Sequence, residues 1–151
     1  MSRSDRLAYY QRALDFWLEA SRIQQQRCLE ASPTDTHARA DICFYVVAVQ
    51  RIREAARMTA DRAGLIAARE ALGEFDALWP QFADLRNDDE HIRGPWPDAP
   101  NTTMYFPHAV AELLPAGRVK FLVHVKVTQE DVERLASRLG ELLSASSGAS
   151  T

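Results

Sequence analysis

The chain has 151 residues, of which 46% are hydrophobic and 26% charged. This length and composition fit one globular domain and exclude wholesale disorder. A net charge of -3 argues against a non-specific polyanion binder. Among the 18 basic residues only Lys120 and Lys126 are lysines, and alanine is abundant, so the arginine excess indicates codon bias rather than nucleic-acid binding.

The first residues lead directly into a polar helical pattern, and no apolar run approaches the ~20 residues that a membrane helix needs. We therefore expect a cytoplasmic protein with no signal peptide and no membrane partner. The two cysteines, Cys28 and Cys43, are expected to be reduced and to lie in the core.

The N-terminal segment predicts a helix that begins at an N-cap on Ser4 and runs to about Ala31. Ser32 and Pro33 end it, because the residue before a proline avoids the helical conformation. Apolar residues at three- and four-residue spacing give this helix one apolar face. They are Leu7, Tyr10, Leu14, Trp17 and Leu18.

Two more helical segments follow. A cap at Thr34 or Asp35 begins the second, which runs to about Arg62 and stops at Gly64. The third spans 65–93 and keeps one apolar phase across a proline, which predicts a kink or a restart near Trp79. The second stripe is Ala38, Ile42, Tyr45, Val49, Ile52 and Ala56; the third is Leu72, Phe75, Leu78, Phe82, Leu85 and Ile92.

The C-terminal third predicts β-structure followed by one helix. Residues 94–101 contain three prolines and form a loop, whereas 102–114 fit either a strand or a short helix. From Arg118 to Val127 apolar residues alternate strictly, which is typical of a strand. Thr128 and Asp131 resemble a capping box that opens the last helix.

Together these elements predict a mainly α fold: an up-and-down helical bundle with an appended C-terminal β-hairpin and a closing helix. We expect a single domain over 1–144, with a helical core at 5–93 and the hairpin and last helix within 102–144. A disordered tail is expected over 145–151. A lone hairpin is marginal in water, so it should pack on the bundle or pair with another chain.

The densest polar cluster lies late in the third segment and contains the pattern Arg86-Asn87-x-x-x-His91. This pattern resembles the signature of HEPN domains, small helical proteins of which many are metal-independent ribonucleases. The resemblance covers about residues 5–93. It implies a HEPN-like RNA-cleaving or RNA-binding protein, such as the toxin half of a toxin–antitoxin pair, with no metal and no cofactor. Some family members carry a tyrosine two residues after the histidine; here that residue is Arg93.

The residue types suit cleavage of RNA through its own 2′-hydroxyl. Such cleavage needs a base near neutrality, and only histidine titrates there unperturbed. Arg86 would stabilise the extra negative charge of the phosphorane, Asn87 would orient the phosphate or the imidazole of His91, and Arg93 would be a secondary phosphate contact. On an ideal helix Arg86 and His91 point about 140° apart, so we expect a homodimer to complete the site.

Other interpretations stay open. The cluster could be a solvated helix end, with Arg86 paired to Glu90 and His91 interacting with the helix dipole. Asp84, Asp88 and His91 share a helical face, but no further metal ligand is indicated. The protein could instead be a non-catalytic helical module that binds an antitoxin or another protein. A small-ligand binder could use Trp17, Trp79 or Trp96 as pocket walls.

Overall fold

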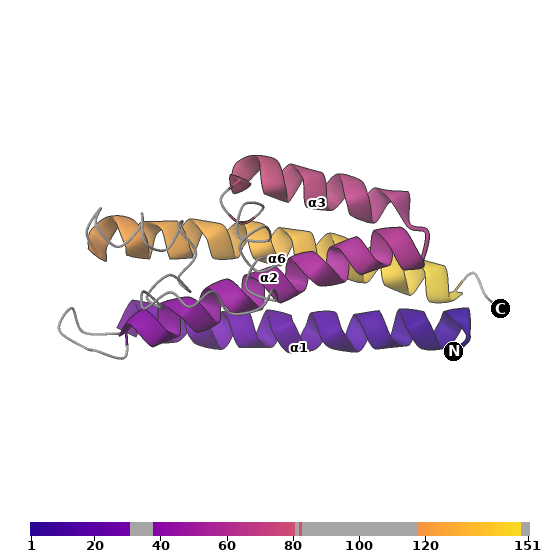
Figure 1. The fold of residues 1–151 in the computed structure, drawn as a ribbon, viewed down its shortest axis with the longest axis horizontal. Helices are drawn as coiled ribbons and strands as arrows, with labels where there is room; N and C mark the ends of the chain where they lie inside the picture. Colours follow the sequence, from indigo (N-terminus) through magenta and orange to yellow (C-terminus); the bar gives the residue numbers. More distant parts are fainter. Residues whose placement is uncertain (31–37, 81, 83–117, 149–151) are drawn as a thin grey trace, which may run out of the picture.

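The computed structural model describes residues 1–30, 38–80, 82 and 118–148, and these form a helical bundle (Figure 1). The helices are α1 (Arg3–Glu30), α2 (Ala38–Arg62), α3 (Ile66–Leu78) and α6 (Arg118–Gly148). Successive helices run in opposite directions, as Figure 1 shows. Helices α2 and α6 contact each other, and both α1 and α3 pack on this pair. The predicted mainly α, up-and-down bundle is therefore confirmed for the described residues.

Helix α1 begins two residues earlier than the predicted cap at Ser4. The backbone N–H of Asp5 donates to the Ser2 hydroxyl at 3.1 Å, and the Ser2 N–H donates to the Asp5 carboxylate at 3.1 Å. This reciprocal pair is a capping box closed by a shorter acid. The hydrogen bonds from Ser2 also lower the pKa of Asp5. Ser2 is therefore the N-cap, and Ser4 lies inside the helix.

The core lies where the predicted stripes of the first two helices face each other. Leu7, Tyr10 and Leu14 of α1 are buried, and Trp17 and Leu18 pack against them. On α2 the predicted stripe is buried at Tyr45, Val49, Ile52 and Ala56. The side chains of Ala38 and Ile42, also predicted there, lie outside the described part of the chain. Helix α6 completes the core with Val132, Leu135, Ala136, Leu139 and Leu143.

The breaks predicted around α3 are present. Gly64 has a φ of 70°, a conformation that costs glycine little, and it separates α2 from α3. Helix α3 ends at Leu78, and the backbone is helical again at Pro80 and Phe82, so the predicted restart near Trp79 is confirmed. The buried residues keep one helical spacing across the break, since Ala71, Phe75, Trp79 and Phe82 follow one another at intervals of four, four and three. Phe75 and Phe82 are buried as predicted, whereas Leu78, predicted in the stripe, is 58% exposed because Trp79 takes its place in the core.

The predicted C-terminal β-hairpin is wrong. Residues 118–127 belong to α6, which is one helix from Arg118 to Gly148, and the described residues contain no strand. The alternating segment also carries a helical spacing, because Phe121 and Val125 precede Thr128 and Val132 at intervals of four, three and four. A strong helix-forming sequence follows without a break, so β propensity is overridden by continuity with the packed helix. Thr128 is accordingly a buried interior residue and not a cap.

The C-terminal boundary also differs from the prediction. Helix α6 continues past Ser144 to Gly148, and the Ser147 hydroxyl donates to the Leu143 carbonyl at 2.9 Å. The disordered tail predicted from 145 onward therefore does not begin there. The predictions for the cap at Thr34 or Asp35, for the loop 94–101 and for 102–114 lie outside the described residues, as do 149–151.

A pair of valine substitutions distinguishes helix from strand at the start of α6. Val127 is 43% exposed and Val132 fully buried. We expect Val127→Ala to change the free energy of unfolding by less than ~0.5 kcal/mol. The small amount of apolar burial that is lost is about balanced by the higher helix propensity of alanine. Val132→Ala should cost roughly 1–3 kcal/mol in urea unfolding. Equal costs would support the predicted strand over 118–127, because Val127 would then be packed as well as Val132 is.

Candidate functional site

The predicted site residues Arg86, Asn87, His91 and Arg93 lie outside the described residues, within 83–117. The described residue nearest to this site is Phe82, which stands four residues before Arg86 in the sequence. The contacts that hold Phe82 in the bundle are therefore what the structure contributes to the candidate site.

Phe82 is fixed by a buried arginine of α2. The Nε and Nη2 of Arg53 donate to the two carboxylate oxygens of Asp76 at 2.7 and 2.8 Å. Its Nη1 donates to the Phe82 carbonyl at 2.8 Å and to Gln50 Oε1 at 2.7 Å. The Gln50 Nε2 donates to the same Phe82 carbonyl at 2.7 Å. We call Gln50, Arg53, Asp76 and the Phe82 carbonyl the arginine clamp.

The clamp joins three parts of the chain through one guanidinium. Arg53 is only 7% exposed, and an arginine is buried only where its charge is paired and its donors are used. The rigid fork of the guanidinium matches the carboxylate of Asp76 in a bidentate pair. Its remaining donors reach the Phe82 carbonyl, and the Phe82 ring lies 6.1 Å from that of Phe75 between centroids. Backbone and ring of Phe82 are thus both held.

Trp79, a candidate pocket wall in the sequence, has a structural role instead. It is buried, and its indole N–H donates to the Asp131 carboxylate of α6 at 2.8 Å. This bond fixes the end of α3 to α6 a few residues before the candidate site. Trp17 is half-buried against the core, and Trp96 lies outside the described residues.

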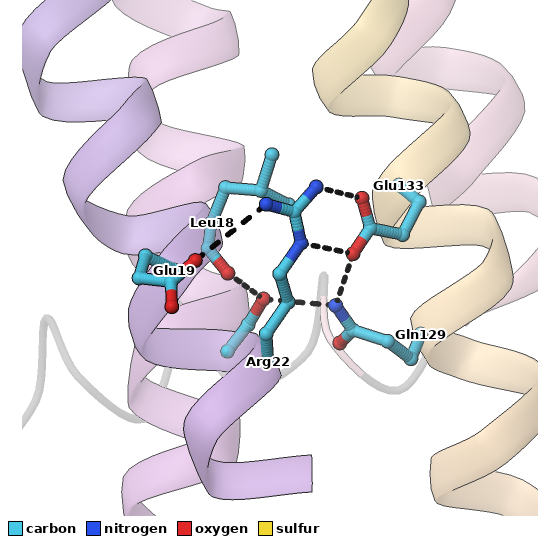
Figure 2. Close-up of polar contacts among 6 residues, drawn as sticks. Leu18, Glu19, Arg22, Gln129 and Glu133 are labelled. Atoms are coloured by element: carbon cyan, nitrogen blue, oxygen red, sulfur yellow. Dashed lines mark hydrogen bonds and ion pairs between the residues drawn. The ribbon is translucent and has the colours of Figure 1, made fainter. Parts of the chain in front are cut away.

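A second polar cluster joins α1 to α6 (Figure 2). The Gln129 Nε2 donates to the Ser21 hydroxyl at 3.0 Å and to Glu133 Oε1 at 3.1 Å. The Ser21 hydroxyl in turn donates to the Leu18 carbonyl at 2.7 Å. Arg22 donates to both carboxylate oxygens of Glu133 at 2.7 Å. These bonds lower the pKa of Glu133, first of all through the hydrogen bond from Arg22.

The titratable groups next to this cluster are held neutral. Burial, together with the negative charge of Asp41, raises the pKa of the Cys28 thiol to about 12. Burial also raises the pKa of Tyr45. A thiol with so high a pKa is a poor nucleophile, so Cys28 is a core residue, as predicted, and not a catalytic one. The side chain of Cys43 lies outside the described residues.

One acceptor of the cluster, the buried carboxamide Oε1 of Gln129, has no partner among the described residues. The hydrogen bonds of the cluster join α1 to α6 or lie within one of these helices. The cluster therefore supports a structural role, the registration of α1 against α6.

The described ranges contain neither a membrane-spanning helix nor a cluster of metal-ligating residues. None of the described helices is long and apolar enough to cross a lipid bilayer. Within the same ranges, no three His, Cys, Asp or Glu residues gather as metal ligands would. The metal-type face Asp84, Asp88 and His91 lies outside them.

Sequence reasoning missed the arginine clamp. The segment of α2 contains Arg51, Arg53 and Arg57, and the sequence does not mark which of them is buried. Asp76, the partner of Arg53, follows 23 residues later, in a helix that also carries Glu70 and Glu74. The sequence therefore does not indicate which acid meets which arginine.

We expect the arginine clamp to carry a large share of the stability of this end of the bundle. Arg53→Ala leaves the partly buried Asp76 carboxylate without its two donors and the Phe82 carbonyl with Gln50 alone, and should cost ~2–4 kcal/mol in urea unfolding. The matched control is Arg51→Ala, which breaks only an exposed pair with Glu54 and should cost ~0.5 kcal/mol or less. Equal costs would contradict the clamp.

The Arg22–Glu133 pair predicts a small acid sensitivity. Because the pKa of Glu133 is lowered in the folded state, the pair stabilises above the ordinary pKa of glutamate and loses this effect as the pH falls through the folded-state pKa. Glu133→Gln should therefore lower the unfolding free energy at pH 7, by ~1 kcal/mol or less for a half-exposed pair, and have a smaller effect at pH 3. Exposed Glu130→Gln is the control. A cost of Glu133→Gln that stays constant with pH would contradict the ion pair.

The comparisons with known proteins do not identify a family for this chain. No protein-family model, no curated protein and no solved structure matches the chain. The resemblance to HEPN domains therefore depends on Arg86, Asn87 and His91 and on the helical segments that precede them.

Proposed function

We propose that this chain is a HEPN-like protein that cleaves RNA without a metal ion, using Arg86, Asn87 and His91. The single observation behind the proposal is the pattern Arg86-Asn87-x-x-x-His91 directly after an anchored helical restart. Arg53 and Gln50 hold the Phe82 carbonyl four residues before Arg86. A catalytic segment benefits from a fixed backbone just before it, because reacting groups act only when they are held in a productive geometry.

Each residue has a distinct role in the proposed chemistry. His91 takes the proton from the 2′-hydroxyl, which attacks the adjacent phosphorus and expels the 5′-oxygen. Arg86 donates to the non-bridging oxygens, where negative charge grows in the transition state. Asn87 orients the phosphate or the imidazole, and Arg93 contacts a neighbouring phosphate. The products are a 2′,3′-cyclic phosphate and a 5′-hydroxyl, and no redox partner or metal takes part.

The proposal includes a homodimer and a restraining partner. Arg86 and His91 point about 140° apart on an ideal helix, so a second copy would bring one His91 to the other chain's Arg86. An enzyme that cuts cellular RNA also needs restraint, which fits the toxin half of a toxin–antitoxin pair with a protein antitoxin.

The second candidate is a non-catalytic helical module that binds a protein. One observation favours it: α1 presents three large apolar side chains to solvent, namely Tyr9, Phe16 and Ile23. The two candidates differ in what they require of His91. A binding module does not need an imidazole in the segment after α3.

The test is cleavage of RNA by the purified full chain in EDTA. Wild-type protein should cleave, because no metal takes part. His91→Ala should abolish cleavage, and Arg86→Ala should reduce the rate by about 10²–10³, the usual loss for one transition-state donor. Gel analysis of labelled RNA gives the rates, and circular dichroism shows that each variant is folded.

Asp98→Ala is the control, because it changes a charge within the proline-rich loop and has no role in the proposed chemistry. It should cleave at the wild-type rate. If folded wild-type protein cleaves none of several RNAs in EDTA, the interaction module becomes the better account. Equal activity of wild type and His91→Ala would contradict the assigned base.

A further inference from the structure

The outward face of α1 carries a regular pattern that packing within the bundle does not use. Tyr9, Phe16 and Ile23 stand seven residues apart and are 54%, 64% and 50% exposed. At 100° per residue, Phe16 lies about 160° from the fully buried Leu14. These three residues therefore form a stripe almost opposite the buried face of α1.

Small residues alternate with the large ones along this stripe. Ala13 and Ala20 each follow a large residue by four positions, which is the spacing of the two core positions in a heptad. We call Tyr9, Ala13, Phe16, Ala20 and Ile23 the α1 seam. A strict seven-residue repeat is the pattern that packs one helix along another, and an isolated surface does not need it.

The large side chains of the seam are held in place before any partner binds. The Phe16 ring lies edge-on to Trp17 at 5.0 Å between centroids, and the Tyr9 ring lies edge-on to Tyr10 at 5.8 Å. Tyr10 is buried and Trp17 packs on the core. Each exposed ring is therefore supported by a ring anchored in the bundle, which reduces the entropy lost when it is covered.

We propose that the α1 seam binds a second copy of this chain, with the two α1 helices antiparallel across a two-fold axis. In an antiparallel pair Phe16 of one copy lies against Ala13 of the other, and Tyr9 against Ala20, so both aromatic side chains of the seam meet a small one, while Ile23 comes level with Arg6. A parallel pair would place large against large and alanine against alanine. The alternation of sizes thus favours the antiparallel, self-complementary contact.

The charges beside the seam fit the same arrangement. Arg12 and Glu19 lie along one edge of the stripe, both exposed. In the antiparallel register set by Phe16 and Ala13, Arg12 of each copy lies within two residues, about 3 Å along the axis, of the level of Glu19 of the other. Both side chains are long enough to close this offset, which gives two ion pairs. A parallel pair would bring the two arginines level and the two glutamates level, so charge complementarity also selects the antiparallel pair.

This interface is separate from the pairing that the proposed RNA site requires. Helix α3, which leads to that site, packs on α2 and α6, and Figure 1 shows it on the far side of them from α1. Failure of the α1 interface would therefore leave the proposed cleavage chemistry untouched, and failure of cleavage would leave the α1 interface untouched.

Sedimentation of the full chain at ~10–100 μM, a range that resolves micromolar dissociation constants, tests the proposal. Wild-type protein should be a dimer through the α1 seam, or a larger assembly where the pairing at the RNA site also forms in solution. Arg12→Glu or Glu19→Arg alone should raise the dissociation constant by about tenfold or more, because two ion pairs become two like-charge contacts. The double variant Arg12→Glu/Glu19→Arg should return close to wild type, since only a second copy restores both pairs at once.

Phe16→Ala should remove the α1 contact and so lower the mass of the assembly by half, whereas Ile66→Ala, which removes a still more exposed apolar side chain from α3, should leave the mass unchanged. If Phe16→Ala loses helical content in circular dichroism, the charge-exchange series decides alone. A wild-type monomer at these concentrations overturns the proposal. So does a dimer that is indifferent to Phe16→Ala, or a double variant that is no better than the singles.

Discussion

The buried guanidinium of Arg53 is the constraint on which this end of the bundle depends. A charge taken out of water must be paired, and Arg53 is paired by Asp76 of α3 and by the carbonyl of Phe82. The two partners stand on either side of the break at Trp79, where α3 ends and the backbone becomes helical again at Pro80. The clamp therefore holds the two sides of this break against α2.

Helix α6 is placed by polar contacts at two levels. Asp131 accepts the indole N–H of Trp79 from the end of α3, and Gln129 donates to Ser21 of α1. Apolar contacts alone permit a helix to slide by a turn at modest cost, whereas a buried hydrogen bond has one partner. The bundle thus has a defined register close to Phe82, where the chain leaves the described core toward Arg86. A fixed backbone at Phe82 suits the proposed site, which would have to hold the base His91 and the phosphate ligand Arg86 in place.

The sequence predicts the helices of the first half well, because their apolar residues recur with one period and their breaks carry proline or glycine. Tyr45, Val49 and Ile52 are buried as expected, and Gly64 separates α2 from α3. The strand over 118–127 was wrong because its residues satisfy both the strand period and the helix period, and the helix that follows decided between them. Leu78 was misassigned because both Leu78 and Trp79 fit the helical spacing between Phe75 and Phe82, and Trp79 is the one that is buried.

The arginine clamp was beyond sequence reasoning for a different reason. Pairing of Arg53 with Asp76 depends on how α2 and α3 cross, and Arg57, one turn further along the same side of α2, is an equally eligible partner from the sequence. For the candidate site the situation is reversed. Arg86, Asn87 and His91 are recognisable by residue type and spacing, while their position in space is not described.

The central functional claim is that His91 and Arg86 use the RNA's own 2′-hydroxyl as the nucleophile. The most direct measurement is incubation of a DNA oligonucleotide containing one ribonucleotide with the full chain in EDTA, followed by analysis of the product ends. The account predicts one cut, after the ribonucleotide, which leaves a 2′,3′-cyclic phosphate. Cutting of the all-DNA oligonucleotide, or a product that carries a 5′-phosphate, would contradict it.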